Sequence, residues 1–170
     1  MVSDGESMAD LLTHVAAAFL VKGLTRRRYA SAFVFGTLAP DLCARVPSIG
    51  LQLARDLVGF ELPDWVVYAV GVMHLPVGML LLSWLLALLT QEEQRRLVFW
   101  NVLGGMALHM AIDLLQDHQT VGYILFFPVA SFPFELGWFG TEASLWVAGP
   151  LALLSAWIWN RGRADRRKPA

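Results

Sequence analysis

Charged residues are scarce in this sequence. Asp, Glu, Lys and Arg together make up 16% of its 170 residues, whereas an average soluble domain carries about 25%. The formal net charge of −1 argues against nucleic acid as a partner, because nucleic-acid-binding domains are usually basic. The hydrophobic share of 56% is more than a soluble protein of this size can bury, so we expect lipid to cover part of the surface.

Cysteine is almost absent as well. The single residue, Cys43, excludes an intramolecular disulfide and any cysteine-rich zinc site. The first ten residues carry acidic side chains and no Lys or Arg, which is the opposite of the basic start of a signal peptide. No P-loop, dinucleotide-binding or Gly-x-Ser-x-Gly pattern occurs in the chain, so the enzyme classes that depend on these motifs are not indicated.

What the sequence does contain is a series of apolar runs typical of membrane helices. Trp65–Gln91 has no acidic or basic residue except His74 and is the strongest run, and Ala143–Asn160 is a second clear span. Leu11–Val21, Tyr29–Pro40 and Leu97–Asp117 are shorter or less apolar. We therefore predict an all-α, polytopic membrane protein with about four to five membrane-associated helices. A single domain should cover residues 1–170.

Short motifs mark where these helices should begin and end. Ser7–Asp10 and Thr90–Glu93 have the pattern of a capping box at a helix start. Asp64 can cap a helix that starts at Trp65. The second apolar run is expected to end at Pro40, because proline interrupts helices.

Two further segments are expected to lie outside the regular spans. Leu42–Glu61 is mixed and amphipathic, and should lie outside the membrane core or at its surface. Gly122–Phe134 is apolar but contains Pro128 and Pro133. We predict an irregular or re-entrant segment there.

Basic residues set the expected orientation. Arg26–Arg28 follow the first run, Arg95 and Arg96 precede the run at Leu97, and the basic tail 161–170 follows the last. The positive-inside rule places all three clusters in the cytoplasm. The runs then alternate in direction, with residues 1–9 as an acidic N-terminal tail.

Five ionisable residues stand within or beside the apolar runs. At ~1.5 Å per residue, each lies roughly 18–32 Å from the cytoplasmic boundary. They come from four different segments, yet all fall on the outer side of the membrane, so we predict that they meet there. The five residues are His14, Asp41, His74, His109 and Asp113.

The most specific local pattern is His109-x-x-x-Asp113, which puts an imidazole and a carboxylate one turn apart on one helix face. Asn101 and Gly105 continue the same face. Two ligands placed in this way can share a metal ion. The alternative is a hydrogen-bonded pair, and His74 and His14 could likewise serve helix packing alone.

The donor types narrow the choice of metal. Three imidazoles and two carboxylates suit Zn²⁺, with Mn²⁺ and Fe²⁺ as alternatives, whereas Ca²⁺ and Mg²⁺ prefer oxygen ligands. Five ligands exceed what one catalytic zinc needs, so either two ions share them or one residue acts as a base. Weaker candidates, expected mainly as loop or interface residues, are Asp117, His118, Glu135 and Glu142.

Taken in order, these motifs resemble those of a known family. The order is His14, Gly36-Thr37-Leu38-Ala39-Pro40-Asp41, His74, Gly104-Gly105-x-x-x-His109-x-x-x-Asp113, Gly122 and Phe127-Pro128. It resembles the YdjM-like family of bacterial inner-membrane proteins, for which metal-dependent hydrolysis has been suggested. It is also distantly similar to zinc-dependent phospholipase C. The likeness covers roughly residues 10–135.

The chain departs from the family pattern at two places. Where the family has Pro-Asp-Leu-Asp, this chain has Pro40-Asp41-Leu42-Cys43, so a thiol replaces a carboxylate and could bind metal in its stead. The family's Arg-x-x-Thr-His-Ser block reads Met73-His74-Leu75 here, with no Arg nearby. The missing Arg weakens the expectation of a phosphate-binding group at that point.

The resemblance implies a multi-pass inner-membrane hydrolase that uses a divalent metal, zinc first, to cleave an ester or phosphoester of a lipid-like substrate. Asp41 would be a metal ligand and the base, and His109 and Asp113 the firmest ligands. Membrane lipids are the expected partners. One alternative is a non-catalytic membrane protein with a structural metal or a hydrogen-bonded polar core. A metal or proton carrier is disfavoured by the unbroken apolar stretch Leu81–Leu89.

Overall fold

The computed structural model describes residues 4–25, 28–59, 72–117, 123–140 and 143–164. Within them the chain is helical apart from short turns and connections, one pair of two-residue strands and the irregular segment between these strands. The all-α prediction is therefore confirmed. The elements are α1 (Asp4–Leu24), α2 (Ala30–Val58), α4 (Pro76–Leu88), α5 (Glu92–Leu115), β1 (Gln116–Asp117), β2 (Phe139–Gly140) and α6 (Ala143–Ala164).

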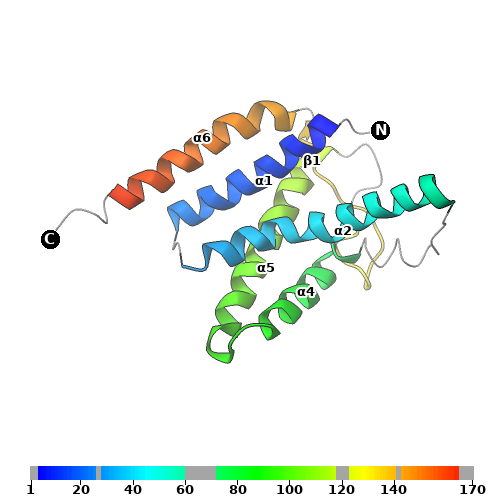
Figure 1. Ribbon diagram of the computed structural model, residues 1–170, viewed down its shortest axis with the longest axis horizontal. Helices are drawn as coiled ribbons and strands as arrows, with labels where there is room; N and C mark the ends of the chain where they lie inside the picture. Colours follow the sequence, from blue (N-terminus) through cyan, green and yellow to red (C-terminus); the bar gives the residue numbers. More distant parts are fainter. Residues whose placement is uncertain (1–3, 26–27, 60–71, 118–122, 141–142, 165–170) are drawn as a thin grey trace.

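Helix α5 lies at the centre of the bundle (Figure 1). It packs against α2 and α4 and contacts α1 as well, while α6 joins the bundle mainly through α1. Helices α1 and α6 run side by side in the same direction, and α2 and α5 run the opposite way. The two short strands pair in parallel, Gln116 with Phe139 and Asp117 with Gly140.

The hydrophobic core sits where α2, α4 and α5 meet. Its buried members are Ala39, Met79, Val98, Val102, Met106 and Met110. The α1–α6 contact is fixed differently, by the Ser155 hydroxyl, which lies 2.7 Å from the backbone oxygens of Ala16 and Leu151. Burying that hydroxyl is tolerated because it has acceptors.

Two glycines bring the backbones of α2 and α5 into direct contact. A Cβ on Gly36 would overlap the Val102 carbonyl group, and one on Gly105 would overlap the Phe33 carbonyl oxygen and approach the Thr37 nitrogen to 2.7 Å. Small residues permit such close approach in helix pairs. The crossing stands about one turn before both Asp41 on α2 and His109 on α5, and so it places these two side chains near each other.

Two predicted helix boundaries are wrong. Helix α2 does not end at Pro40 but continues through Pro40 and Pro47 to Val58. Proline removes only one helical hydrogen bond, and tight packing of α2 against α5 can hold the helix on both sides of it. The amphipathic stretch that begins at Leu42 is therefore the second half of one long helix.

The predicted uninterrupted helix over Trp65–Gln91 is also wrong in its described part. Residues 72–75 form a turn, and α4 starts only at Pro76. Leu75 before it is extended (φ −93°, ψ 153°), because a residue that precedes proline avoids the helical region. His74 therefore lies in a turn and not on a helix. Residues 60–71, with Asp64, lie outside the described part.

Neither capping box acts as predicted. Helix α1 begins at Asp4, so Ser7–Asp10 lies inside it. The N-cap of α5 is Gln91, with no side-chain hydrogen bond, and the Thr90 hydroxyl instead donates to the Ala87 oxygen of α4 at 2.7 Å. Tertiary packing of an amphipathic helix outweighs such local signals.

The remaining segments agree with expectation. The described part of Gly122–Phe134 is irregular, held by one bridge between Tyr123 and Phe134. Helix α6 contains the run Ala143–Asn160, which is therefore helical as predicted, whereas its crossing of the membrane stays a prediction. Gly122 itself lies outside the described residues.

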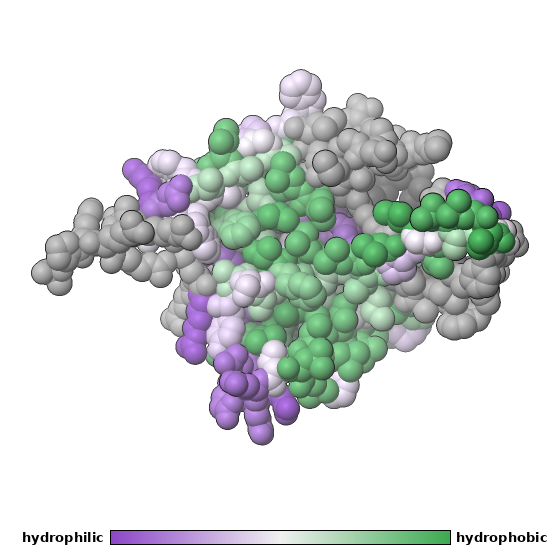
Figure 2. Space-filling model, in the orientation of Figure 1, coloured by the Kyte–Doolittle hydropathy of each residue, from purple (hydrophilic) through white to green (hydrophobic). Residues whose placement is uncertain are grey.

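The molecular surface carries much apolar area. Figure 2 shows hydrophobic residues across the middle of the visible face and hydrophilic ones near its edges. Among the described helices, α5 alone is long and apolar enough to cross a membrane, and the shorter apolar helices are Leu11–Leu24, Ala30–Cys43 and Pro76–Leu88. Because the other described helices are either too short or not apolar enough over a full span, the number of membrane crossings stays a prediction.

Candidate metal centre

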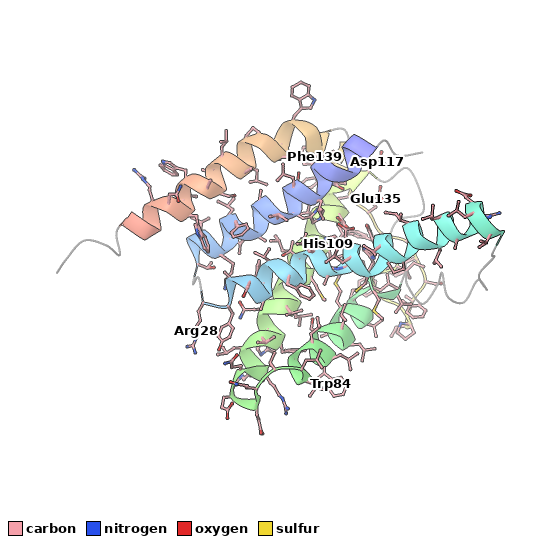
Figure 3. The ribbon with its side chains drawn as sticks, viewed as in Figure 1. Arg28, Trp84, His109, Asp117, Glu135 and Phe139 are labelled. Atoms are coloured by element: carbon pink, nitrogen blue, oxygen red, sulfur yellow. The ribbon has the colours of Figure 1, made fainter. Side chains whose placement is uncertain are left out.

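The structure brings all five predicted site residues together near the middle of the bundle. His14 comes from α1, Asp41 from α2, His74 from the turn before α4, and His109 and Asp113 from α5. Figure 3 shows His109 of α5 between α1 and α2, and its side chain is fully buried. Their convergence was predicted from the sequence, whereas their roles as ligands remain our proposal.

Asp113 is the most heavily contacted carboxylate of the cluster. Its Oδ1 lies 2.9 Å from His14 Nε2, and its Oδ2 lies 3.1 Å from His109 Nε2. The Tyr123 hydroxyl donates to the same Oδ2 at 2.9 Å. Asp113 is 4% exposed, so these contacts form away from bulk water, where each is stronger than on a surface.

His109 stands between the other two imidazoles. Its ring centroid is 4.3 Å from that of His14 and 5.5 Å from that of His74. Both His14 and His109 are fully buried. Within the described residues neither ring nitrogen of His109 meets the geometric criteria of a hydrogen bond, although Nε2 lies 3.1 Å from Asp113 Oδ2. Buried polar atoms rarely lack a hydrogen-bond partner, and where they do, a bound ion or water that contacts them is a usual explanation.

Asp41 and His74 close the cluster on the side of α2 and α4. Asp41 Oδ1 lies 3.7 Å from His74 Nε2, a distance at which two ligands can face one ion or be bridged by water. Asp41 is 4% exposed, while 17% of the His74 side chain is exposed. His74 is thus the most open member of the five.

The donor atoms form two overlapping sets of three. His14, Asp41 and His109 make one set, and His74, His109 and Asp113 make the other, with the donor atoms of each set all within 4.8 Å of one another. Ligand atoms that bind one ion at ~2.1 Å lie roughly 3.0–3.4 Å apart. Within the second set, the 3.1 Å between His109 Nε2 and Asp113 Oδ2 falls in that range. The 2.9 Å contact between His14 and Asp113 joins one set to the other.

Charge also favours a divalent cation. With neutral histidines, the two aspartates give the cluster a charge of −2 in a buried setting. Two like charges in a low-dielectric interior are costly unless a counter-charge is present. A single divalent ion balances them, so the residues present fit such an ion in donor type, spacing and charge.

The weaker candidates lie apart from these two sets. Cys43 belongs to neither set, so the described structure gives no support for a thiolate in place of the family's second aspartate. Asp117 and Glu135 belong to neither set and lie toward the end of α5 (Figure 3). His118 and Glu142 lie outside the described residues.

One residue of the site was missed at the sequence level. Tyr123 lies in the irregular segment after α5, and its hydroxyl reaches Asp113. Neither helix periodicity nor spacing points to it. Its place directly after Gly122, within the motif order of the resembling family, was the only available signal.

These features define a class: an all-helical protein with an apolar surface that holds three histidines and two aspartates around one buried point. The family model of the YdjM inner membrane protein family matches residues 8–167. The chain therefore belongs to this family, and the resemblance drawn from the motifs is confirmed. Its membership is consistent with an inner-membrane location. No curated protein and no solved structure gives a significant match.

Proposed function

We propose that this protein is a membrane-embedded, metal-dependent hydrolase that cleaves an ester or phosphoester of a lipid-like substrate. The observation that carries the proposal is the pair of three-residue donor sets that share His109. Zn²⁺ is the first choice of metal, with Mn²⁺ and Fe²⁺ as alternatives. A divalent ion bound there lowers the pKa of a coordinated water and so supplies a nucleophile near neutral pH.

Each residue has a role that follows from its surroundings. His109 and Asp113 are the firmest ligands, because they share a helix face and make the closest contacts. Asp41 has its second carboxylate oxygen buried inside the cluster, where it can both bind metal and accept a proton from water. His14 and His74 complete the donor sets.

The lipid-like substrate is supported by the setting of the cluster. The site lies inside a bundle whose visible face is apolar across its middle (Figure 2), in a protein of an inner-membrane family. A substrate with an apolar part can reach such a site from the bilayer. His74, the partly exposed member, marks the side from which access is expected.

The orientation rests on the basic residues. Arg28 lies at the α1–α2 end of the bundle, where the α4–α5 turn and the end of α6 also lie (Figures 1 and 3). With these ends in the cytoplasm, the chain is multi-pass, its C-terminus is cytoplasmic and the cluster faces the outer leaflet. A C-terminal fusion tests this, because it should be protected from protease added to spheroplasts, whereas an outward-facing C-terminus would be cleaved.

A structural metal is the second candidate, and the depth of the cluster favours it. Four of the five residues are at most 4% exposed, and structural zinc sites are closed while catalytic ones keep an open position. The same contacts without a metal would form a hydrogen-bonded polar core.

The deciding experiment is elemental mass spectrometry of the purified full chain in mild detergent. Wild type should carry near-stoichiometric zinc, manganese or iron, and His109→Ala and Asp113→Ala should lose it. Asp117→Asn, at an exposed residue of strand β1 two positions after α5 ends, is the matched control and should keep it. If the metal-loaded wild type hydrolyses phospholipids, the hydrolase proposal is supported. If it binds metal but hydrolyses nothing, the structural role is supported. If wild type takes up no metal after supplementation, both proposals are overturned.

A further inference from the structure

The chain returns to the cluster after leaving α5. The Leu136 and Trp138 amides donate to the Leu114 and Leu115 oxygens, both at 2.9 Å. Strand β2 then pairs with β1 at the end of α5. Residues 123–140 are thereby tied to the last turn of the helix that carries Asp113.

Tyr123 is fixed by its backbone within this segment. Its amide donates to the Phe134 oxygen at 3.1 Å, and the Phe134 amide donates back to the Tyr123 oxygen at 2.9 Å. This pair of hydrogen bonds fixes the position of the Tyr123 backbone. From there the hydroxyl reaches Asp113 Oδ2 at 2.9 Å.

Both oxygens of Asp113 are therefore held from outside α5. His14 of α1 holds Oδ1, and Tyr123 holds Oδ2. A carboxylate oxygen has two lone pairs, so the Tyr123 hydrogen bond leaves one lone pair of Oδ2 for a cation.

We propose that Tyr123 is a positioning residue, which orients Asp113 as a metal ligand and keeps it in place when the ion leaves. This rests on the proposed metal centre. Groups that hold a ligand through a hydrogen bond typically change metal affinity by about 10–100-fold. Tyr123 has this effect although it lies in an irregular segment outside every helix.

The test compares Tyr123→Phe with wild type in the full detergent-purified chain. The variant removes only the hydroxyl. Tyr29→Phe is the matched control, because Tyr29 packs against the core at the start of α2 and lies in neither donor set. Zn²⁺ affinity is measured by competition with a chromophoric chelator, and the visible absorption of bound Co²⁺ reports the ligand geometry.

The expected result is a 10–100-fold loss of Zn²⁺ affinity and a changed Co²⁺ spectrum in Tyr123→Phe, with Tyr29→Phe like wild type. Melting with and without Zn²⁺ separates this from a packing role. If Tyr123 positions Asp113, the Tyr123→Phe variant should show a smaller rise in Tm on adding Zn²⁺ than wild type. If Tyr123 only packs, the variant's Tm should fall equally with and without Zn²⁺, which overturns the assignment. If the Zn²⁺ affinity and the Co²⁺ spectrum of Tyr123→Phe are unchanged, the positioning role of Tyr123 is overturned, but the proposed metal centre is not. Wild type that binds no metal overturns the centre itself.

Discussion

Helices α1 and α5 meet at two polar contacts of different chemistry, one buried and one part-buried. At one, His14 faces His109 and Asp113. At the other, Lys22 Nζ donates to Asn101 Oδ1 at 2.9 Å. Lys22 stands eight residues after His14, and Asn101 eight before His109, on helices that run in opposite directions (Figure 1). The two contacts therefore lie about 12 Å apart along the same interface.

The difference lies in which contact can accept a cation. The His–Asp contact offers lone pairs and a negative charge. The other contact already holds a cation, since Lys22 is only 7% exposed and lies 5.5 Å from the centre of the Phe33 ring as well as beside Asn101. Burial of polar groups is common to both, so burial alone does not define a site; donor type and charge do.

The largest expected effect tests the first contact. His109→Ala removes the residue common to both donor sets, so Zn²⁺ affinity should fall by more than about 100-fold, beyond what groups that merely orient a ligand cause. Isothermal titration with Zn²⁺ measures it. Retained affinity in this variant would show that the sets do not share His109.

Gly105 stands midway between Asn101 and His109, and its substitution should disturb both contacts. In Gly105→Ala the added methyl group overlaps the α2 backbone, and such overpacking costs about 1–3 kcal/mol. The melting temperature and the metal content of the variant should both fall.

Gly104→Ala is the neighbouring control. Its methyl group would meet only the edge of the Phe33 ring at 3.2 Å, and a side chain can yield by that amount. A loss as large as that of Gly105→Ala would mean that the backbone crossing is not what matters.

Lys22→Met should leave the metal site intact while destabilising the fold. The Asn101 amide oxygen loses its donor, which costs about 1–3 kcal/mol. Adding Asn101→Leu should restore much of the lost stability, because an apolar side chain at this contact costs less free energy than a polar group without a hydrogen-bond partner. Denaturant unfolding measures stability, and a fall in metal content would instead couple the two contacts.

Cys43→Ala should have the smallest effect. The thiol lies in neither donor set, so Zn²⁺ content should equal that of wild type by elemental analysis. A substantial drop would return Cys43 to the role of a ligand that replaces the family's second aspartate.

The sequence predicted which residues converge, for a physical reason. Helix rise is constant, and basic clusters indicate which ends of the apolar runs lie on one side. Counting residues from Arg28 to Asp41, or from Arg96 to His109, therefore gives comparable depths. The packing of α2 and α5 then brings these two side chains together.

The surroundings of the cluster were not predictable in the same way. The path that returns Tyr123 to Asp113 follows backbone hydrogen bonds of an irregular segment, which has no period. Pro76 was a readable signal that His74 precedes a helix, but the apolar composition around it pointed to one continuous span. Tertiary contacts likewise carried α2 past Pro40, where local rules predicted an end.

The glycine crossing of α2 and α5 has a mechanical consequence. Asp41 lies about five residues, or roughly 7.5 Å, beyond the contact at Gly36. Pivoting α2 there by about 10° displaces Asp41 by roughly 1.3 Å, far more than the ~0.2 Å that metal–ligand distances tolerate. Bilayer thickness alters helix tilt. We therefore expect stretching of the surrounding membrane to tilt α2 about Gly36 and so to change the distance of Asp41 from the other residues of the cluster.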